Sequence, residues 1–121
     1  MKSRDTLIRL KRFHVEEKRR RVRQIEMMTA EFNRMIADLD REIANEEKRT
    51  GISDPSHFAY PTYARAATGR RDNLKSSIAE LDQQIDDAKA ALDVELAELQ
   101  KLESLDGREK ASERQAEAVR A

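Results

Sequence analysis

The stretch "GISDPSHFAYPTY", residues 51–63, interrupts a chain that is otherwise dominated by charged, helix-forming residues. It holds both prolines of the 121-residue sequence and three of its five aromatic side chains. Gly51 can end a preceding helix, because glycine enters the left-handed cap conformation at little cost. The ring of Pro61 blocks the helical hydrogen bond before it, so a helix can begin there but cannot run through it. The stretch therefore predicts a structured reversal over residues 50–60.

Composition favours long helices over a compact globular core. Charged residues make up 40% of the chain and hydrophobic residues 38%, and tryptophan is absent, which leaves few large side chains for an interior. Disorder is the alternative for such a chain, so the spacing of the apolar residues has to decide. Cysteine is absent, which excludes a disulfide framework and a thiolate zinc site. No apolar run is long enough for a membrane span or a signal-peptide core, so we expect a soluble, cytoplasmic protein.

A heptad repeat precedes the reversal, and a second one follows it. In the first repeat the seam positions are Ile8, Lys11, Val15, Lys18, Val22, Ile25, Thr29, Phe32, Ile36, Leu39 and Ile43. In the second repeat they are Leu74, Ile78, Leu81, Ile85, Ala88, Leu92, Glu95, Leu99 and Leu102. Regular stripes of this length are typical of coiled coils and not of disordered chains.

Two heptad tracts joined by one Gly/Pro break predict an all-α fold, a long antiparallel two-helix coiled-coil hairpin. We expect a single coiled-coil domain over residues 1–121, with helix one at about 4–49 and helix two at about 61–107. The remaining residues, 108–121, form helix readily but lack an apolar face, so we expect a mobile tail there.

The charges are unevenly distributed, although the formal net charge is zero. Residues 1–23 contain ten Lys/Arg and three acidic residues, a local charge of +7. Residues 72–106 contain ten acidic residues and three lysines, a local charge of −7. Antiparallel pairing places the two segments side by side, which supports the hairpin and opposes parallel self-association. Each exposed pair contributes only about 0–1 kcal/mol, so most of these charges are expected to be ordinary solvated side chains.

We name residues 1–23 the basic arm. Its candidate partner-binding residues are Lys11, Arg12, Lys18, Arg19, Arg20, Arg21 and Arg23. Lysines at two seam positions weaken local pairing but keep this end of the hairpin polar. Three consecutive arginines fan across about 200° of a helix, so Arg19, Arg20 and Arg21 cannot all face one neighbouring helix. We expect at least one of them to remain free for an acidic surface outside the chain.

The reversal carries three large aromatic side chains: Phe58, Tyr60 and Tyr63. Two interpretations are open, because these side chains can fold back over the end of the seam or can form an apolar contact surface for a partner. The segment "DPSHF" is predicted to form one short helical turn. Ser53 or Asp54 can cap this turn, and Pro55 can occupy its first position.

No catalytic, cofactor or metal site is predicted. His57 lies near Asp54, but no serine or cysteine nucleophile accompanies them, and a thin hairpin has no concave interior. His14 and Glu17 are two possible metal ligands without a third. The three glycines are isolated, so there is no phosphate-binding loop. We therefore expect a non-enzymatic protein that uses no cofactor.

Three interpretations of function follow from the residues. The first is an interaction rod, with a polarised charge at one end and an aromatic reversal at the other. The second is a nucleic-acid-binding protein, since "EKRRRVRQIE" sets a basic run ahead of heptads as in basic-zipper proteins. That run lacks the asparagine and small residues that read base edges. The third is a general chaperone of the helical-hairpin type.

Three segments of the chain resemble one known family. They are "MKSRDTLIRLKRFHVEEKRRRVRQIEMM" at residues 1–28, "ADLDREIANEE" at residues 37–47 and "GISDPSHFAYPTYARAA" at residues 51–67. With the predicted hairpin they resemble the FliJ family of flagellar export proteins, in its alphaproteobacterial form. The resemblance covers nearly the whole chain and is weakest after Leu105.

The resemblance implies a non-enzymatic central stalk of the flagellar type III export apparatus, similar to the part of the rotary-ATPase gamma subunit that enters the catalytic ring. Its implied partners are the export ATPase FliI, the membrane export gate FlhA and export chaperones, with no specific nucleic acid. The implied location is cytoplasmic, peripheral to the membrane export complex at the flagellar basal body. These roles belong to the ends of the hairpin, and our hypothesis places the basic arm at the ATPase ring.

Overall fold

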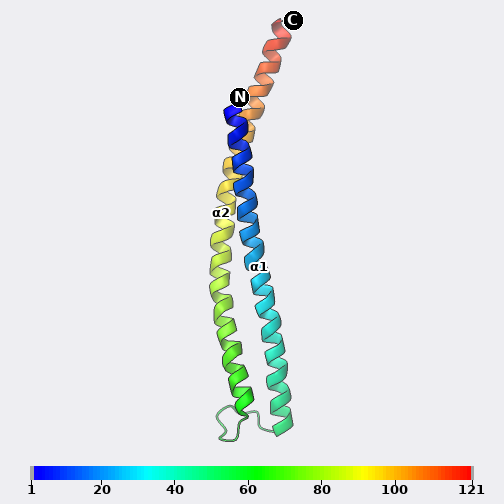
Figure 1. Ribbon diagram of the computed structural model, residues 1–121, viewed down its shortest axis with the longest axis vertical. Coiled ribbons are helices and arrows are strands. Elements are labelled where there is room, and N and C mark those ends of the chain that lie inside the picture. The colour runs from blue at the N-terminus through cyan, green and yellow to red at the C-terminus, as the bar shows by residue number, and fades with distance from the viewer. Residues whose placement is uncertain (1, 121) are drawn as a thin grey trace. The chain divides into compact units, whose positions relative to one another are not determined.

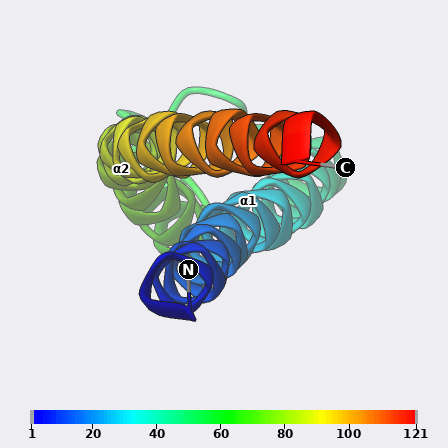
Figure 2. The ribbon, with the colours of Figure 1, turned by 90° about the horizontal axis from the view of Figure 1, so that it is seen from above.

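The computed structural model describes residues 2–120, and within that range the chain forms two α-helices and no strand. Helix α1 spans Lys2–Thr50 and α2 spans Thr62–Arg120. The helices run in opposite directions and pack against each other, joined by a short non-helical connection (Figure 1). The predicted all-α, antiparallel two-helix hairpin is confirmed. Figure 2 shows the same two helices and their connection from above.

The helix ends near the reversal lie close to the predicted ones, but the expected end of helix two is wrong. Helix α2 continues through Gly107 to Arg120. Of the three glycines, only Gly51 has the positive backbone φ that ends a helix, and its φ is 75°. A helical glycine costs roughly 0.5–1 kcal/mol relative to alanine, which the good helix formers around Gly107 offset. The mobility expected of the tail stays a prediction, and Ala121 lies outside the described residues.

The chain divides into two compact units, and both helices contribute to each. The terminal unit comprises residues 1–23 and 86–121, and the reversal unit comprises residues 24–85. Ion pairs and hydrogen bonds fix the antiparallel order within each unit. In the terminal unit they join Arg4 to Glu109 and Lys11 to Glu98. In the reversal unit they join Asp40 to Arg71 and Glu47 to Tyr60.

The buried side chains follow the predicted heptads. In α1 they are Ile8, Val15, Val22, Ile25 and Ile43, all of them at seam positions. In α2 Leu81 is buried, and the other predicted seam residues are half-buried. The α2 seam also extends back to Ala64 and Ala67, which are fully buried. The predicted register is therefore confirmed, and small residues let the two backbones approach closely beside the reversal.

Burial along the α1 seam is uneven. Ile25 is the only large side chain among the described residues that is completely buried, whereas Phe32 and Leu39 are half-buried. A second helix covers one side of a seam residue, and no third layer among residues 2–120 covers the other side. The stability of the hairpin therefore depends most on the best-covered positions.

Replacing Ile25 with alanine should lower the free energy of unfolding by roughly 2–5 kcal/mol, because the lost side chain leaves a cavity in the seam. Met27 lies on the same helix but is 71% exposed, so Met27→Ala should change it by less than about 0.5 kcal/mol. Phe32→Ala should fall between the two. Urea denaturation followed by circular dichroism measures all three variants. Equal losses for Ile25→Ala and Met27→Ala would mean that the register is wrong.

Candidate partner-binding surfaces

The basic arm pairs with acidic residues of α2 inside the terminal unit. The pairs are Arg4–Glu109, Lys11–Glu95, Lys11–Glu98 and Arg12–Glu103. The expected neighbourhood of the arm and the acidic segment 72–106 is thus confirmed for Lys11 and Arg12, whereas Arg4 pairs with Glu109, beyond that segment. Three of the arm's cations therefore pair with α2 within the hairpin, although the side chain of Arg12 remains 62% exposed.

Lys11 occupies a seam position and is half-buried. Its Nζ atom lies 3.0 Å from Oε2 of Glu95 and also donates to Glu98. The hydrogen bond to Glu98, followed by that to Glu95, raises the pKa of Lys11 above its ordinary value of 10.5, and desolvation opposes this shift. The ammonium group therefore remains charged at neutral pH. Because a charged seam residue needs its acidic partners, it favours the one register that supplies them.

The consecutive arginines of the arm have different surroundings. Nη1 of Arg19 lies 3.1 Å from Oε1 of Glu16, one turn earlier on the same helix. Arg20 and Arg23 are exposed and form no ion pair with any residue in the range 2–120. Arg21 is also exposed. The expectation that at least one of the three consecutive arginines remains free is met by Arg20.

The reversal contains two successive turns instead of the predicted short helical turn. The carbonyl of Asp54 accepts from the amide of His57 at 3.0 Å, and the carbonyl of His57 accepts from the amide of Tyr60 at 3.1 Å. Asp54 does act as a cap, since its Oδ1 accepts from the amide of Ser56 at 2.9 Å. Each turn ends after one hydrogen bond of the i+3 type, so no helix propagates. The carbonyl of Pro61 then accepts from the amide of Arg65 at 3.0 Å, which starts α2.

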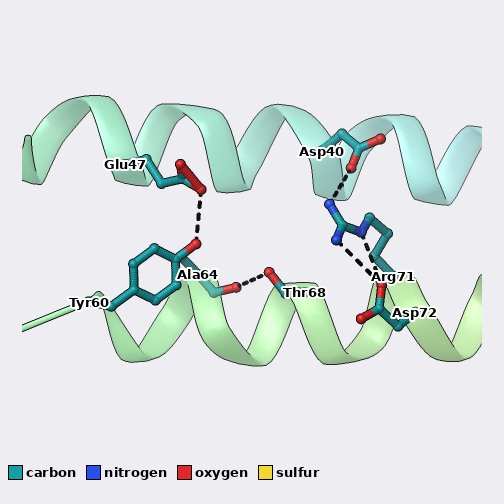
Figure 3. Close-up of polar contacts among 7 residues, drawn as sticks. All are labelled: Asp40, Glu47, Tyr60, Ala64, Thr68, Arg71 and Asp72. Carbon is teal, nitrogen blue, oxygen red and sulfur yellow. Dashed lines mark hydrogen bonds and ion pairs between the residues drawn. The ribbon is translucent and has the colours of Figure 1, made fainter. Parts of the chain in front are cut away.

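Tyr60 folds back onto the hairpin. It is 6% exposed, and its hydroxyl donates to Oε1 of Glu47 on α1 at 2.9 Å (Figure 3). The guanidinium of Arg65 lies 5.4 Å from the centre of its ring. Of the two interpretations, the structure therefore supports the folded-back one for Tyr60, because its ring covers the end of the seam.

The other two aromatic residues remain accessible. Phe58 is 95% exposed and stacks on His57, with ring centroids 4.8 Å apart. Tyr63 is half-exposed, and its hydroxyl donates to Oε2 of Glu42 at 2.9 Å. The two interpretations of the aromatic group thus apply to different members, and Phe58 is the side chain that projects most freely.

Polar contacts hold the two helices together beside the reversal. Nη1 of Arg71 lies 3.1 Å from Oδ1 of Asp40 on α1, and its Nε lies 3.3 Å from Oδ1 of Asp72 (Figure 3). Within α2, the hydroxyl of Thr68 donates to the carbonyl of Ala64 at 2.8 Å. Arg71 occupies the seam position after the alanines, so a charge bridge there replaces an apolar layer.

The histidines serve local structure. Nδ1 of His57 accepts from the amide of Ala59 at 3.0 Å, and the ring of His14 meets Phe13 edge-on. Across the described range there is no group of three or more His, Cys, Asp or Glu residues placed to hold a metal ion. Nor does any helix among the described residues have the length and apolarity needed to cross a membrane.

Two sets of exposed apolar residues were missed by the sequence analysis. On the basic arm they are Leu7, Leu10 and Phe13, and in the reversal unit they are Met27, Met28 and Met35. Met35 also lines an open groove of about 440 Å³ together with Leu39, Leu74 and Arg70. The spacing of the three arm residues, which recur every three positions, could have predicted a second apolar face. It was overlooked because most residues around them are charged.

Comparisons of the chain with known protein families, with curated proteins and with solved structures find no match.

Replacing Phe58 with alanine should leave the melting temperature within about 1 °C of the wild type, because its side chain contacts little of the hairpin. Tyr60→Ala should lower it by several degrees, since a loss of about 1 kcal/mol shifts the melting temperature by roughly 4–8 °C for domains of 60–100 residues and by roughly 2–4 °C for domains of 150–250 residues. Thermal denaturation followed by circular dichroism compares the two variants. A larger loss for Phe58→Ala than for Tyr60→Ala would contradict the division of roles.

The two tyrosines should titrate differently. The hydrogen bond to Glu42 is the main cause that raises the pKa of Tyr63 above 10, so Glu42→Gln should return it most of the way. Burial is the main cause for Tyr60, so Glu47→Gln should lower its raised pKa only in part. Because folding raises both pKa values, the protonated tyrosines favour the folded chain at neutral pH. This contribution to the free energy of unfolding is lost as the pH rises through the two pKa values. Side-chain NMR of labelled tyrosine measures both, and an ordinary pKa for Tyr60 in the folded chain would place its ring in water.

Proposed function

We propose that this chain is a non-enzymatic central-stalk and coupling component of the flagellar type III export apparatus. Its basic arm binds an acidic surface of the ring formed by the export ATPase FliI. Phe58 and Tyr63, at the reversal, contact the export gate FlhA or an export chaperone. The chain acts in the cytoplasm, peripheral to the membrane export complex at the flagellar basal body. The resemblance of residues 1–28, 37–47 and 51–67 to the FliJ family supports this assignment.

The observation that carries the proposal is an excess of cations on the arm. Arg4, Lys11 and Arg12 satisfy acidic residues of α2, and Arg19 is paired on its own helix. Arg20 and Arg23 are left without a carboxylate among the described residues, and both are exposed. Cations that the fold does not use steer an acidic partner toward this end of the chain.

The architecture of the terminal unit also supports a stalk. Two helices pair there without a further layer, so this unit has the small cross-section that a ring pore admits. Its exposed charge favours contacts that are weak and exchangeable, because screened surface pairs contribute little individually. A stalk that is turned or exchanged inside a ring needs both properties.

The nucleic-acid alternative receives less support. In a basic zipper the basic helix has no neighbour and is free to enter the major groove. Here three cations of the arm are paired with α2, which lies along the same segment. The general chaperone alternative draws on the exposed Met27, Met28 and Met35, since flexible methionines suit varied apolar clients.

The double variant Arg20→Glu, Arg23→Glu should abolish stimulation of the purified export ATPase. Its apparent Kd for that ATPase should rise about tenfold or more at low salt, and by less at high salt, where screening already weakens the contact. Helicity should persist, because glutamate forms helix as well as arginine does.

The matched control is Arg34→Glu, Arg41→Glu, which makes the same change in charge on the same helix. Both control arginines are exposed but already paired one turn away, with Glu31 and Asp38. The control should stimulate the ATPase normally. If the Arg20→Glu, Arg23→Glu protein stays helical and still stimulates the ATPase at the wild-type level, the basic arm does not contact the ring.

A further inference from the structure

An apolar patch lies on the basic arm, outside the seam. Leu7, Leu10 and Phe13 are 51%, 52% and 56% exposed, and they belong to the N-terminal part of α1, drawn in blue in Figure 1. Residues three apart on a helix are neighbours, so the three side chains form one continuous strip, which we name the arm patch. The seam positions beside them are Ile8 and Lys11, so α2 covers the seam and leaves the arm patch open.

The spacing of the arm patch is that of a second amphipathic face. Single exposed apolar residues are common on protein surfaces, but three large ones at helical spacing are typical of a face that packs on another helix. α1 therefore has two apolar faces within the terminal unit. One face is occupied by α2, and no described part of the chain covers the other.

Two exposed arginines without an ion pair among the described residues lie beside the arm patch. Arg9 lies between Leu7 and Leu10 in the sequence, is exposed and forms no ion pair with the described residues. Arg20 follows Phe13 by seven residues, so it lies two turns further along the same face. Glu17 lies on that face, Glu16 is already paired with Arg19, and Asp5 lines the same open cavity as Arg9.

We propose that the arm patch docks one amphipathic helix of a partner protein whose flanking residues are acidic. The apolar stripe of that helix covers Leu7, Leu10 and Phe13, and its carboxylates face Arg9 and Arg20. The terminal unit then becomes a three-helix bundle with α1 in contact with both other helices. This surface shares Arg20 with the proposed ATPase contact, but Leu7, Leu10, Phe13 and Arg9 lie outside that contact, and the readout is binding of a helix and not stimulation of an ATPase.

Charge and size argue against a second copy of the chain as the occupant. Two copies that covered each other's arm patch would bring together two arms that each carry a local charge of +7. Stable homodimers bury about 1,200–2,000 Å² or more, and three half-exposed side chains supply only a small part of that area. A single docked helix needs only a few anchors at helical spacing, which the arm patch provides.

Two synthetic helical peptides test the proposal on the full chain. They share one leucine stripe and differ only at the flanking positions, which are glutamate in one peptide and lysine in the other. Fluorescence anisotropy should give a Kd for the glutamate peptide at least about tenfold lower than for the lysine peptide. Arg9→Gln should reduce that preference without abolishing binding.

The double variant Leu10→Gln, Phe13→Gln should weaken binding of the glutamate peptide about tenfold or more, while circular dichroism stays unchanged. The matched control is Val94→Gln, because Val94 lies on α2 in the same unit and is also 56% exposed. The control should bind the peptide as the wild type does.

Four results would overturn the proposal. These are equal affinity for both peptides, no binding of either peptide, wild-type affinity in the double variant, and equal losses in the double variant and in Val94→Gln. Sedimentation that finds a wild-type dimer abolished by the double variant would assign the arm patch to a second copy instead. Binding to anionic phospholipid vesicles without binding to the glutamate peptide would assign it to a membrane.

Discussion

A hairpin of two helices has only one seam in which to bury apolar side chains, and the rest of this structure depends on that constraint. Each helix is the only cover for the other, so even good seam residues such as Phe32 and Leu39 are half-buried. Many large apolar residues off the seam are therefore exposed to water. The exposure of Leu10, Phe13 and Met27 follows directly from this geometry and from the absence of a third layer among the described residues.

The same constraint gives charged residues a structural role in the terminal unit. Lys11 interrupts the apolar seam and pairs with Glu95 and Glu98, so part of the arm's positive charge is used to align the helices. Where the arm has cations without such partners, as at Arg20, the charge is available to the surroundings. This division separates the cations that help to maintain the fold from those that the fold leaves exposed without an ion pair to any described residue.

The sequence predicted the hairpin and its register because heptad spacing is a direct record of which side chains share a helix face. The reversal was also foreseen, since Gly51 has the positive φ that its position suggested. The burial of Tyr60 and the exposure of Phe58 were not predictable, because they depend on how two successive turns orient each ring. Gly107 was misread as a helix end, since a single glycine weakens a helix without breaking it when good helix formers surround it. The arm patch escaped notice because charge dominates the composition of its segment.

The most direct test of the central claim is the salt dependence of binding between the wild-type chain and a purified flagellar export ATPase, measured by calorimetry. The account predicts specific binding that weakens steadily as salt rises from low to physiological ionic strength, because exposed arginines supply the contact. Absence of binding at low salt, or an affinity that does not change with salt, would contradict it.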